Sequence, residues 1–252
     1  MFNAFIAALQ FLTRISIKKN ININDELLLK SMIFFPVVGG IIGLVQAIIY
    51  LGVYRFVSSL ISAVLLVIIP IILTGAFHME GFADMTDGFL SGRTKEKILL
   101  IMKESTVGTM GAIGISCLIL VKFVFYKELT NYTNVNHLML VLILIQMLSR
   151  WAMVISASIS KNARDGASLA RAFTDGADLK LAVLSGIIPV ISMILFLKIY
   201  GLIAVAITIC ISMYISNISK KKIGGITGDV LGAINEITEI GLLFYMIVIK
   251  IK

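Results

Sequence analysis

Charged residues and cysteines are scarce in this chain. Of its 252 residues only 14% are charged and 59% are hydrophobic, and the mean hydropathy of +1.02 is too high for a water-soluble domain of this length. The two cysteines lie in separate apolar runs, which excludes a disulfide framework or a CxxC metal site. The chain has only three prolines and no clear repeat or linker, so residues 1–252 are interpreted as one integral membrane domain.

Long apolar runs predict an all-α fold, a polytopic membrane bundle of about seven transmembrane helices. A helix needs about 20 apolar residues to cross a bilayer. Five runs meet this need clearly: Met32–Tyr50, Val57–Phe77, Leu138–Ile159, Leu181–Tyr200 and Leu202–Ile218. Two others are less clear because they contain or border lysines, so tilting, snorkelling and an interfacial position remain open for them: Thr109–Tyr126 and Ile240–Ile251.

The basic residues are distributed unevenly between the predicted loops. Seven spans would place 15 of the 22 lysines and arginines on one side, in four polar segments: Arg14–Lys30, Phe77–Gly108, Ser160–Lys180 and Ser219–Glu239. By the positive-inside rule this side is cytoplasmic, so we expect a cell-membrane protein whose acidic loops face the cytoplasm. The net charge of +8 follows from membrane topology, and no nucleic-acid partner is expected. A lipid environment is expected instead.

Three carboxylates gather where the second apolar run ends. Glu80, Asp84 and Asp87 are spaced four and three residues apart, which places them on one face of a helix. Such a concentration of negative charge at a membrane boundary is costly unless a cation neutralises it, and oxygen ligands suit Mg²⁺. The spacing therefore predicts a metal site with catalytic carboxylates.

A second acidic motif occurs near the C-terminus. Asp229 and Glu236 share a helical face, and Gly224, Gly225 and Gly228 precede or flank the predicted start of that helix. The glycines allow a backbone to approach closely, and the helix start offers free N–H groups to a phosphate. A plain glycine turn with a capping aspartate is the alternative. Beside the first motif, a site shared by the two motifs is the stronger interpretation.

Several polar residues between these motifs are candidates for binding a phosphorylated substrate. Lys103 and Ser105 lie in a glycine-containing loop, for which an ordinary helix N-cap is the alternative. Arg150 lies within a span, where an arginine needs a polar cavity or a buried acidic partner. Three more candidates lie at predicted span ends: Arg14, Arg164 and His78. For Arg14 the alternative is a snorkelling side chain. His78 is expected to support a ligating residue instead of binding the metal itself.

At these residues the chain resembles the cobalamin-5′-phosphate synthase family, also called adenosylcobinamide-GDP ribazoletransferases. The resemblance covers nearly the whole chain and is carried by these segments: Phe11–Arg14, Phe34–Gly39, Thr74–His78, Gly81–Asp84, Asp87–Gly88, Ile101–Lys103, Gly108–Thr109 and Gly225–Ala233 with Glu236. The family usually has aspartate where this chain has Glu80 and Glu104, and a basic residue where it has Thr106. The change at Thr106 places more of the phosphate binding on the remaining basic residues.

The resemblance implies a reaction and a set of roles. Adenosylcobinamide-GDP would react with α-ribazole, or its 5′-phosphate, to give adenosylcobalamin, or its 5′-phosphate, and GMP. Mg²⁺ is the implied cofactor, held by Asp84, Asp87, Asp229 and, with less support, Glu80. Glu236 or Glu80 would deprotonate the attacking hydroxyl, Arg150 and Arg164 would hold phosphate oxygens, and Gly225 and Gly228 would let backbone approach. A homo-oligomer is one open possibility for the assembly.

Two other functions are alternatives to this one. Another Mg²⁺-dependent membrane phosphotransferase, such as a CDP-alcohol phosphotransferase, also places paired acidic motifs at helix ends, but its D-x-x-D-G-x-x-A-R pattern is absent from the sequence. A transporter would use intramembrane charges such as Lys122 and Arg150 as its pathway, and would place ionisable groups near the bilayer midplane.

Overall fold

The computed structural model describes residues 1–17, 21, 24–164 and 169–249, and within these ranges the fold is all-α. The only strand-like pairing among the described residues is an isolated parallel bridge between Asn162 and Ile226. The helices are α1 (Phe2–Leu12), α2 (Asp25–Ser31), a 3₁₀ turn (Met32–Phe34), α3 (Phe35–Val53), α4 (Ser59–Thr74), α5 (Phe77–Leu90), α6 (Lys95–Ile101), α7 (Thr109–Tyr132), α8 (Val135–Ser158), α9 (Leu169–Thr174), α10 (Leu179–Ile223) and α11 (Gly228–Ile249).

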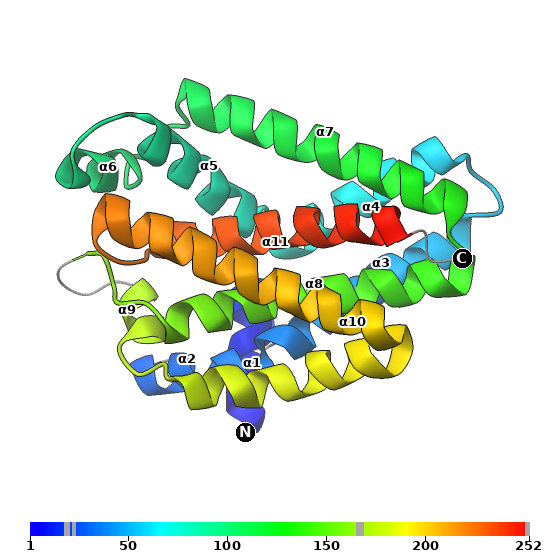
Figure 1. Cartoon of the computed structure of the whole chain (residues 1–252), viewed down its shortest axis with the longest axis horizontal. Coiled ribbons are helices and arrows are strands. Elements are labelled where there is room, and N and C mark those ends of the chain that lie inside the picture. The colour runs from blue at the N-terminus through cyan, green and yellow to red at the C-terminus, as the bar shows by residue number, and fades with distance from the viewer. Residues whose placement is uncertain (18–20, 22–23, 165–168, 250–252) are drawn as a thin grey trace.

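The expected membrane helices are present, but their expected number of seven is not confirmed. Within the described ranges, five helices are long and apolar enough to cross a membrane, and a sixth crossing results if α4 and α5, which meet at 92°, are counted as one span. Two expected spans fall together in α10, which is broken at Lys198 (φ 52°, ψ −126°) and whose two arms fold back side by side (Figure 1). The last expected span runs into residues 250–251, which lie outside the described residues.

Helix α8 forms the centre of the bundle, packed against α3, α10 and α11. Two glycines one turn apart allow α3 to approach it closely. A Cβ added to Gly39 would lie 2.1 Å from the carbonyl oxygen of Gln146, and one added to Gly43 would lie 2.5 Å from that of Leu142. This spacing of small residues is typical of membrane helices. Such helices associate through close packing, because there is no hydrophobic driving force between helices within a lipid bilayer.

The break between α4 and α5 redirects the chain toward the polar end of the bundle. Gly75 (φ 66°) and Ala76 (φ 63°) both adopt the left-handed conformation, which ends α4. The following helix, α5, then packs against α7 and α11. The first acidic motif therefore lies on a helix that is bent away from the span preceding it.

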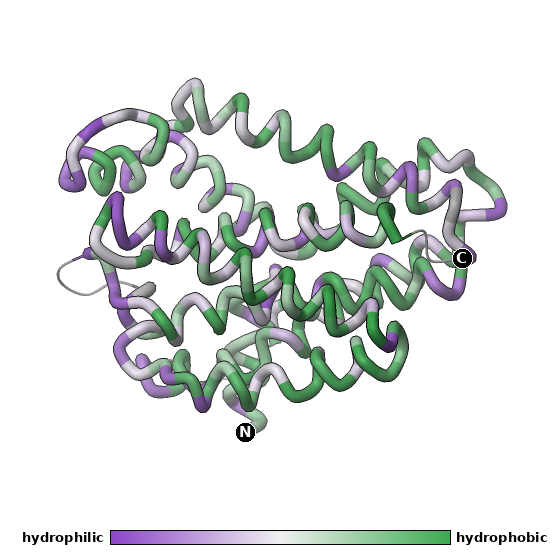
Figure 2. Tube along the Cα trace, viewed as in Figure 1, coloured by the Kyte–Doolittle hydropathy of each residue, from purple (hydrophilic) through white to green (hydrophobic). Residues whose placement is uncertain are grey.

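Polar residues gather mainly at one end of the bundle (Figure 2). The α5–α6–α7 connection, the segment between α8 and α10, and the turn from α10 to α11 meet at this end (Figure 1). We call it the polar end. Three of the four polar segments predicted to share one side of the membrane therefore lie at the same end of the fold, and the fourth, residues 14–30, lies partly outside the described residues.

Candidate functional site

Both acidic motifs meet at the polar end, where α5 crosses the start of α11. Asp84 is close enough to interact electrostatically with the other three carboxylates, and Arg164 is the cation beside them. Glu80 is exposed, whereas Asp84, Asp87 and Asp229 are partly buried. We call Glu80, Asp84, Asp87 and Asp229 the acidic cluster. The structure thus brings together the four residues that the sequence predicts as metal ligands.

Two glycines make this close crossing of α5 and α11 possible. A Cβ added to Gly81 would lie 2.7 Å from the carbonyl oxygen of Asp229, and one added to Gly232 would lie 3.1 Å from that of His78. The start of α11 is stabilised by Thr227, whose hydroxyl accepts a hydrogen bond from the backbone N–H of Val230, as an N-cap does. The predicted helix start near Asp229 is therefore confirmed.

Arg164 links the acidic cluster to the segment that follows α8. Its Nη2 lies 3.1 Å from a carboxylate oxygen of Asp229 and donates a hydrogen bond of 3.3 Å to the carbonyl oxygen of Met102. The Arg164 side chain keeps 28% of its surface exposed. The arginine is therefore held in place but is still accessible to an anionic ligand.

Asp87 has a structural role that the sequence analysis missed. Its two carboxylate oxygens accept hydrogen bonds of 2.7 Å from the backbone N–H groups of Gly108 and Gly111. Helix α7 begins here with Gly108 as its N-cap, and a glycine has no side chain to satisfy the first N–H groups. Asp87 supplies this cap from 21 and 24 residues away, a separation at which no local pattern could reveal it.

Within the described part of the chain, the structure shows no hydrogen bond or ion pair between the acidic cluster and the other basic and hydroxyl candidates. Lys103 and Ser105 are exposed in the connection between α6 and α7. Arg14 is exposed and lies across Gly75, where an added Cβ would be 2.0 Å from the Arg14 Nε. His78 is buried, and neither of its ring nitrogens has a hydrogen-bond partner among the described residues.

Gly225 and Gly228, the two glycines of the second motif that were predicted to let a backbone approach, differ in their surroundings. A Cβ at Gly225 would lie 2.4 Å from the carbonyl oxygen of Lys161, because the chain here pairs with residues 161–163. A Cβ at Gly228 would meet nothing within 4 Å. Gly225 is thus required by the protein's own packing, whereas Gly228 leaves open space beside Asp229.

Glu236 does not belong to the acidic cluster but to a second group of charges inside the bundle. Lys122 of α7 lies 2.5 Å from Glu236 and 3.0 Å from Glu239, and Tyr126 donates a hydrogen bond of 2.9 Å to Glu239. All four side chains are buried. We call Lys122, Tyr126, Glu236 and Glu239 the buried network. It explains how Lys122 is tolerated within a span, since the two glutamates neutralise it.

Arg150 extends this network from α8. Its side chain is only 1% exposed and donates hydrogen bonds to Gln146 and Ser149. Glu236 and Glu239 are close enough to stabilise its positive charge. Of the two sequence interpretations of Arg150, buried pairing is therefore the one that the geometry supports, and the structure places Arg150 away from the exposed polar end.

The acidic cluster suits Mg²⁺ by its donor chemistry. All its donors are carboxylate oxygens, the ligands that hard cations prefer, and Asp84 has three acidic neighbours against one arginine. Within the described ranges, no three His, Cys, Asp or Glu side chains converge on a single point as in a formed metal centre. Binding of Mg²⁺ would therefore require the carboxylates to move toward one another.

Fold and site together define an α-helical membrane protein with a carboxylate-rich site at one end of its bundle. Residues 4–247 match the family model described as cobalamin-5-phosphate synthase. The chain belongs to this family, as its sequence motifs predicted.

Curated relatives agree with the family match over nearly their full length. A protein of Caldanaerobacter subterraneus subsp. tengcongensis is 36% identical over 247 residues, which are 96% of each chain. One of Clostridium acetobutylicum is 36% identical, covering 94% of this chain and 93% of its own, and one of Clostridium kluyveri is 34% identical over 100% and 99%. All three are named adenosylcobinamide-GDP ribazoletransferase. No solved structure is significantly similar to the chain.

Proposed function

We propose that this protein joins adenosylcobinamide-GDP to α-ribazole, or to its 5′-phosphate, and releases GMP, the step that assembles the nucleotide loop of coenzyme B12. The observation that carries the proposal is the proximity of Asp84 to Glu80, Asp87 and Asp229 at one end of the bundle. The names of its curated relatives support the choice of substrates.

In the proposed reaction, a ribose hydroxyl of the acceptor attacks the phosphorus atom that is attached to cobinamide. A new P–O ester bond forms, the pyrophosphate P–O bond breaks, and GMP leaves with that oxygen. The hydroxyl proton must go to a base. Glu80 is the better placed of the two candidates, because it is exposed beside the cluster, whereas Glu236 is buried and bound to Lys122.

Asp84, Asp87 and Asp229 would hold Mg²⁺, which when bound neutralises charge on the pyrophosphate and on the leaving phosphate. Arg164, already fixed beside Asp229, would bind a phosphate oxygen. Arg14, Lys103 and Ser105 are exposed and are the further phosphate-binding candidates. The open space beside Gly228 would admit the phosphate groups of the substrate.

We also propose that the polar end faces the cytoplasm and that the protein lies in the cell membrane. The concentration of lysines and arginines in the segments of that end supports this orientation by the positive-inside rule. Lipid would contact the exposed apolar side chains that cover the spans, such as Ile72, Leu195 and Val248.

The test is GMP release together with corrinoid product, measured by mass spectrometry on protein purified in lipid. Adenosylcobinamide-GDP and α-ribazole, or its 5′-phosphate, are supplied with Mg²⁺ or with EDTA. Product that forms only with Mg²⁺ is expected. Absence of product from folded protein would contradict the proposal and would favour the alternative function, a CDP-alcohol type phosphotransferase. Substrate-dependent GMP release would also separate the proposal from transport, the rival for which buried charges such as Lys122 are typical.

A further inference from the structure

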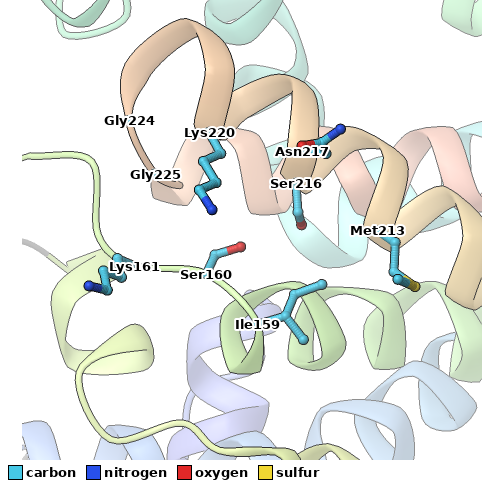
Figure 3. A pocket seen from close by; sticks show the side chains of 9 residues that line it. All are labelled: Ile159, Ser160, Lys161, Met213, Ser216, Asn217, Lys220, Gly224 and Gly225. Atoms are coloured by element: carbon cyan, nitrogen blue, oxygen red, sulfur yellow. The ribbon is translucent and has the colours of Figure 1, made fainter.

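A pocket at the polar end is lined by residues outside the acidic cluster. It has a volume of about 510 Å³, within the range of small-molecule sites, and separates the C-terminal part of α10 from the segment that follows α8. Its walls include Ile159, Ser160, Lys161, Met213, Ser216 and Lys220 (Figure 3). Of the described residues that line it, none is acidic.

The polar groups of this pocket converge as donors around an anion would. Figure 3 shows the ammonium group of Lys220 pointing toward the 160–161 segment, with the hydroxyls of Ser160 and Ser216 turned into the same gap. Ser216 is only 6% exposed, and its hydroxyl has no hydrogen-bond partner among the described residues. A buried hydroxyl without a partner costs free energy, which a bound ligand would recover.

The rest of the pocket and its position restrict the ligand further. Ile159 and Met213 provide an apolar wall beside the cationic one. On its other side, Ser160 and Lys161 also line a neighbouring cavity of about 500 Å³ that contains Arg164, the partner of Asp229. A ligand that fits the pocket would thus have an anionic end and an apolar part, and it would lie next to the cavity that Arg164 lines.

We infer that this pocket binds the phosphate end of the acceptor, α-ribazole 5′-phosphate, with Lys220 as the residue that selects the phosphorylated form. The inference rests on the proposed function. Lys220 donates to the phosphate, Ser160 and Ser216 donate hydrogen bonds to it, and the apolar wall contacts the benzimidazole ring. Another phosphate ester with an apolar part, a lipid headgroup, has the same chemistry and is distinguished by experiment.

The kinetic test compares Lys220→Gln with Lys221→Gln, which removes the same charge one residue further along α10 but does not line the pocket. Lys220→Gln should raise the KM for α-ribazole 5′-phosphate about tenfold or more, the size expected for one charge-assisted hydrogen bond, and leave the KM for α-ribazole unchanged. Ser216→Ala should have the same selective effect, but a smaller one. Equal effects on both acceptors, or none, would overturn the inference.

A binding measurement separates this inference from the proposed function. Thermal unfolding of the full chain in phosphatidylcholine nanodiscs, without adenosylcobinamide-GDP or metal, is followed as α-ribazole 5′-phosphate is added. Stabilisation of the wild type and of Lys221→Gln, but not of Lys220→Gln, supports the pocket even if no turnover is seen. If phosphatidylglycerol in the discs gives this pattern and the nucleotide does not, the occupant is a lipid and the acceptor assignment is wrong.

Discussion

The protein contains two groups of carboxylates, and they differ in how their charge is balanced. In the acidic cluster, four carboxylates face a single arginine at the partly exposed polar end. Inside the bundle, Glu236 and Glu239 face two cations, Lys122 and Arg150, and all of these side chains are buried. The first group has unbalanced negative charge, and the second is neutral as a whole.

Charge balance thus distinguishes two groups of carboxylates that residue type and helical spacing alone do not separate. Buried charges are tolerated in a membrane protein when they are paired, and breaking such a pair is costly. Unpaired carboxylates at a solvent-accessible end repel one another, and they persist where a cation or a phosphorylated ligand restores the balance. We therefore expect substitutions in the cluster to affect turnover, and substitutions in the buried network to affect stability.

The largest expected effect on activity is that of neutralising the cluster. Asp84→Asn and Asp229→Asn should each lower turnover about 100-fold or more, because metal binding contributes several kcal/mol to the transition state. Asp84→Asn should not lower the thermal unfolding temperature, since it removes like-charge repulsion, whereas Asp229→Asn also weakens the ion pair with Arg164 and should lower this temperature slightly. Asp25→Asn, at the exposed start of α2, is the control. Near wild-type GMP release by both variants would show that these residues do not bind the metal.

The buried network should respond in the opposite way. Lys122→Met leaves two buried glutamates with only Arg150 and should cost about 3–5 kcal/mol of stability, measured by thermal unfolding in detergent. Lys127→Met, on the same helix but outside the network, is the control. The double variant Lys122→Met/Glu239→Gln restores charge balance, so it should be less destabilised than the sum of its single substitutions. Strict additivity would argue against coupled charges.

An intermediate effect on both properties is expected at the helix crossing that builds the cluster. Gly81→Ala introduces a Cβ 2.7 Å from the backbone of Asp229 and should cost about 1–3 kcal/mol while also lowering turnover, because it pushes α5 away from α11. Gly52→Ala, where a Cβ meets nothing within 4 Å, should be tolerated. Activity and unfolding temperature are measured for both. An unaffected Gly81→Ala protein would mean that the crossing need not be this close.

Asp87 should show the smallest change, because it belongs to the cluster and also caps α7. In Asp87→Asn the amide oxygen can still accept one of the two backbone hydrogen bonds, so the loss of stability should be about 1 kcal/mol. Turnover should fall less than in Asp84→Asn. If Asp87→Asn lowers the stability but leaves turnover per folded molecule normal, Asp87 acts only as the cap of α7 and does not bind the metal. Unfolding temperature and GMP release, each normalised to folded protein, decide this.

Much of the fold was predictable from local patterns. The expected run beginning at Thr109 starts where α7 starts, and the helix expected near Asp229 begins at Gly228. The fold-back at Lys198 lies two residues before the end of the expected span Leu181–Tyr200, and the break between α4 and α5 at Gly75 lies inside the expected span Val57–Phe77. Apolar composition does not show where a helix changes direction. The number of spans therefore could not be counted from hydropathy alone.

Sequence by itself determined the membrane class of the protein, its family, and which carboxylates belong to the two acidic motifs, since hydropathy and helical spacing are local properties. Only the tertiary structure decided which of these carboxylates are paired. Lys122 meets Glu236 across 114 residues, and Arg164 meets Asp229 across 65. Charge balance depends on such distant neighbours in space, which is why Glu236 shares a helical face with Asp229 and yet belongs to the interior of the bundle.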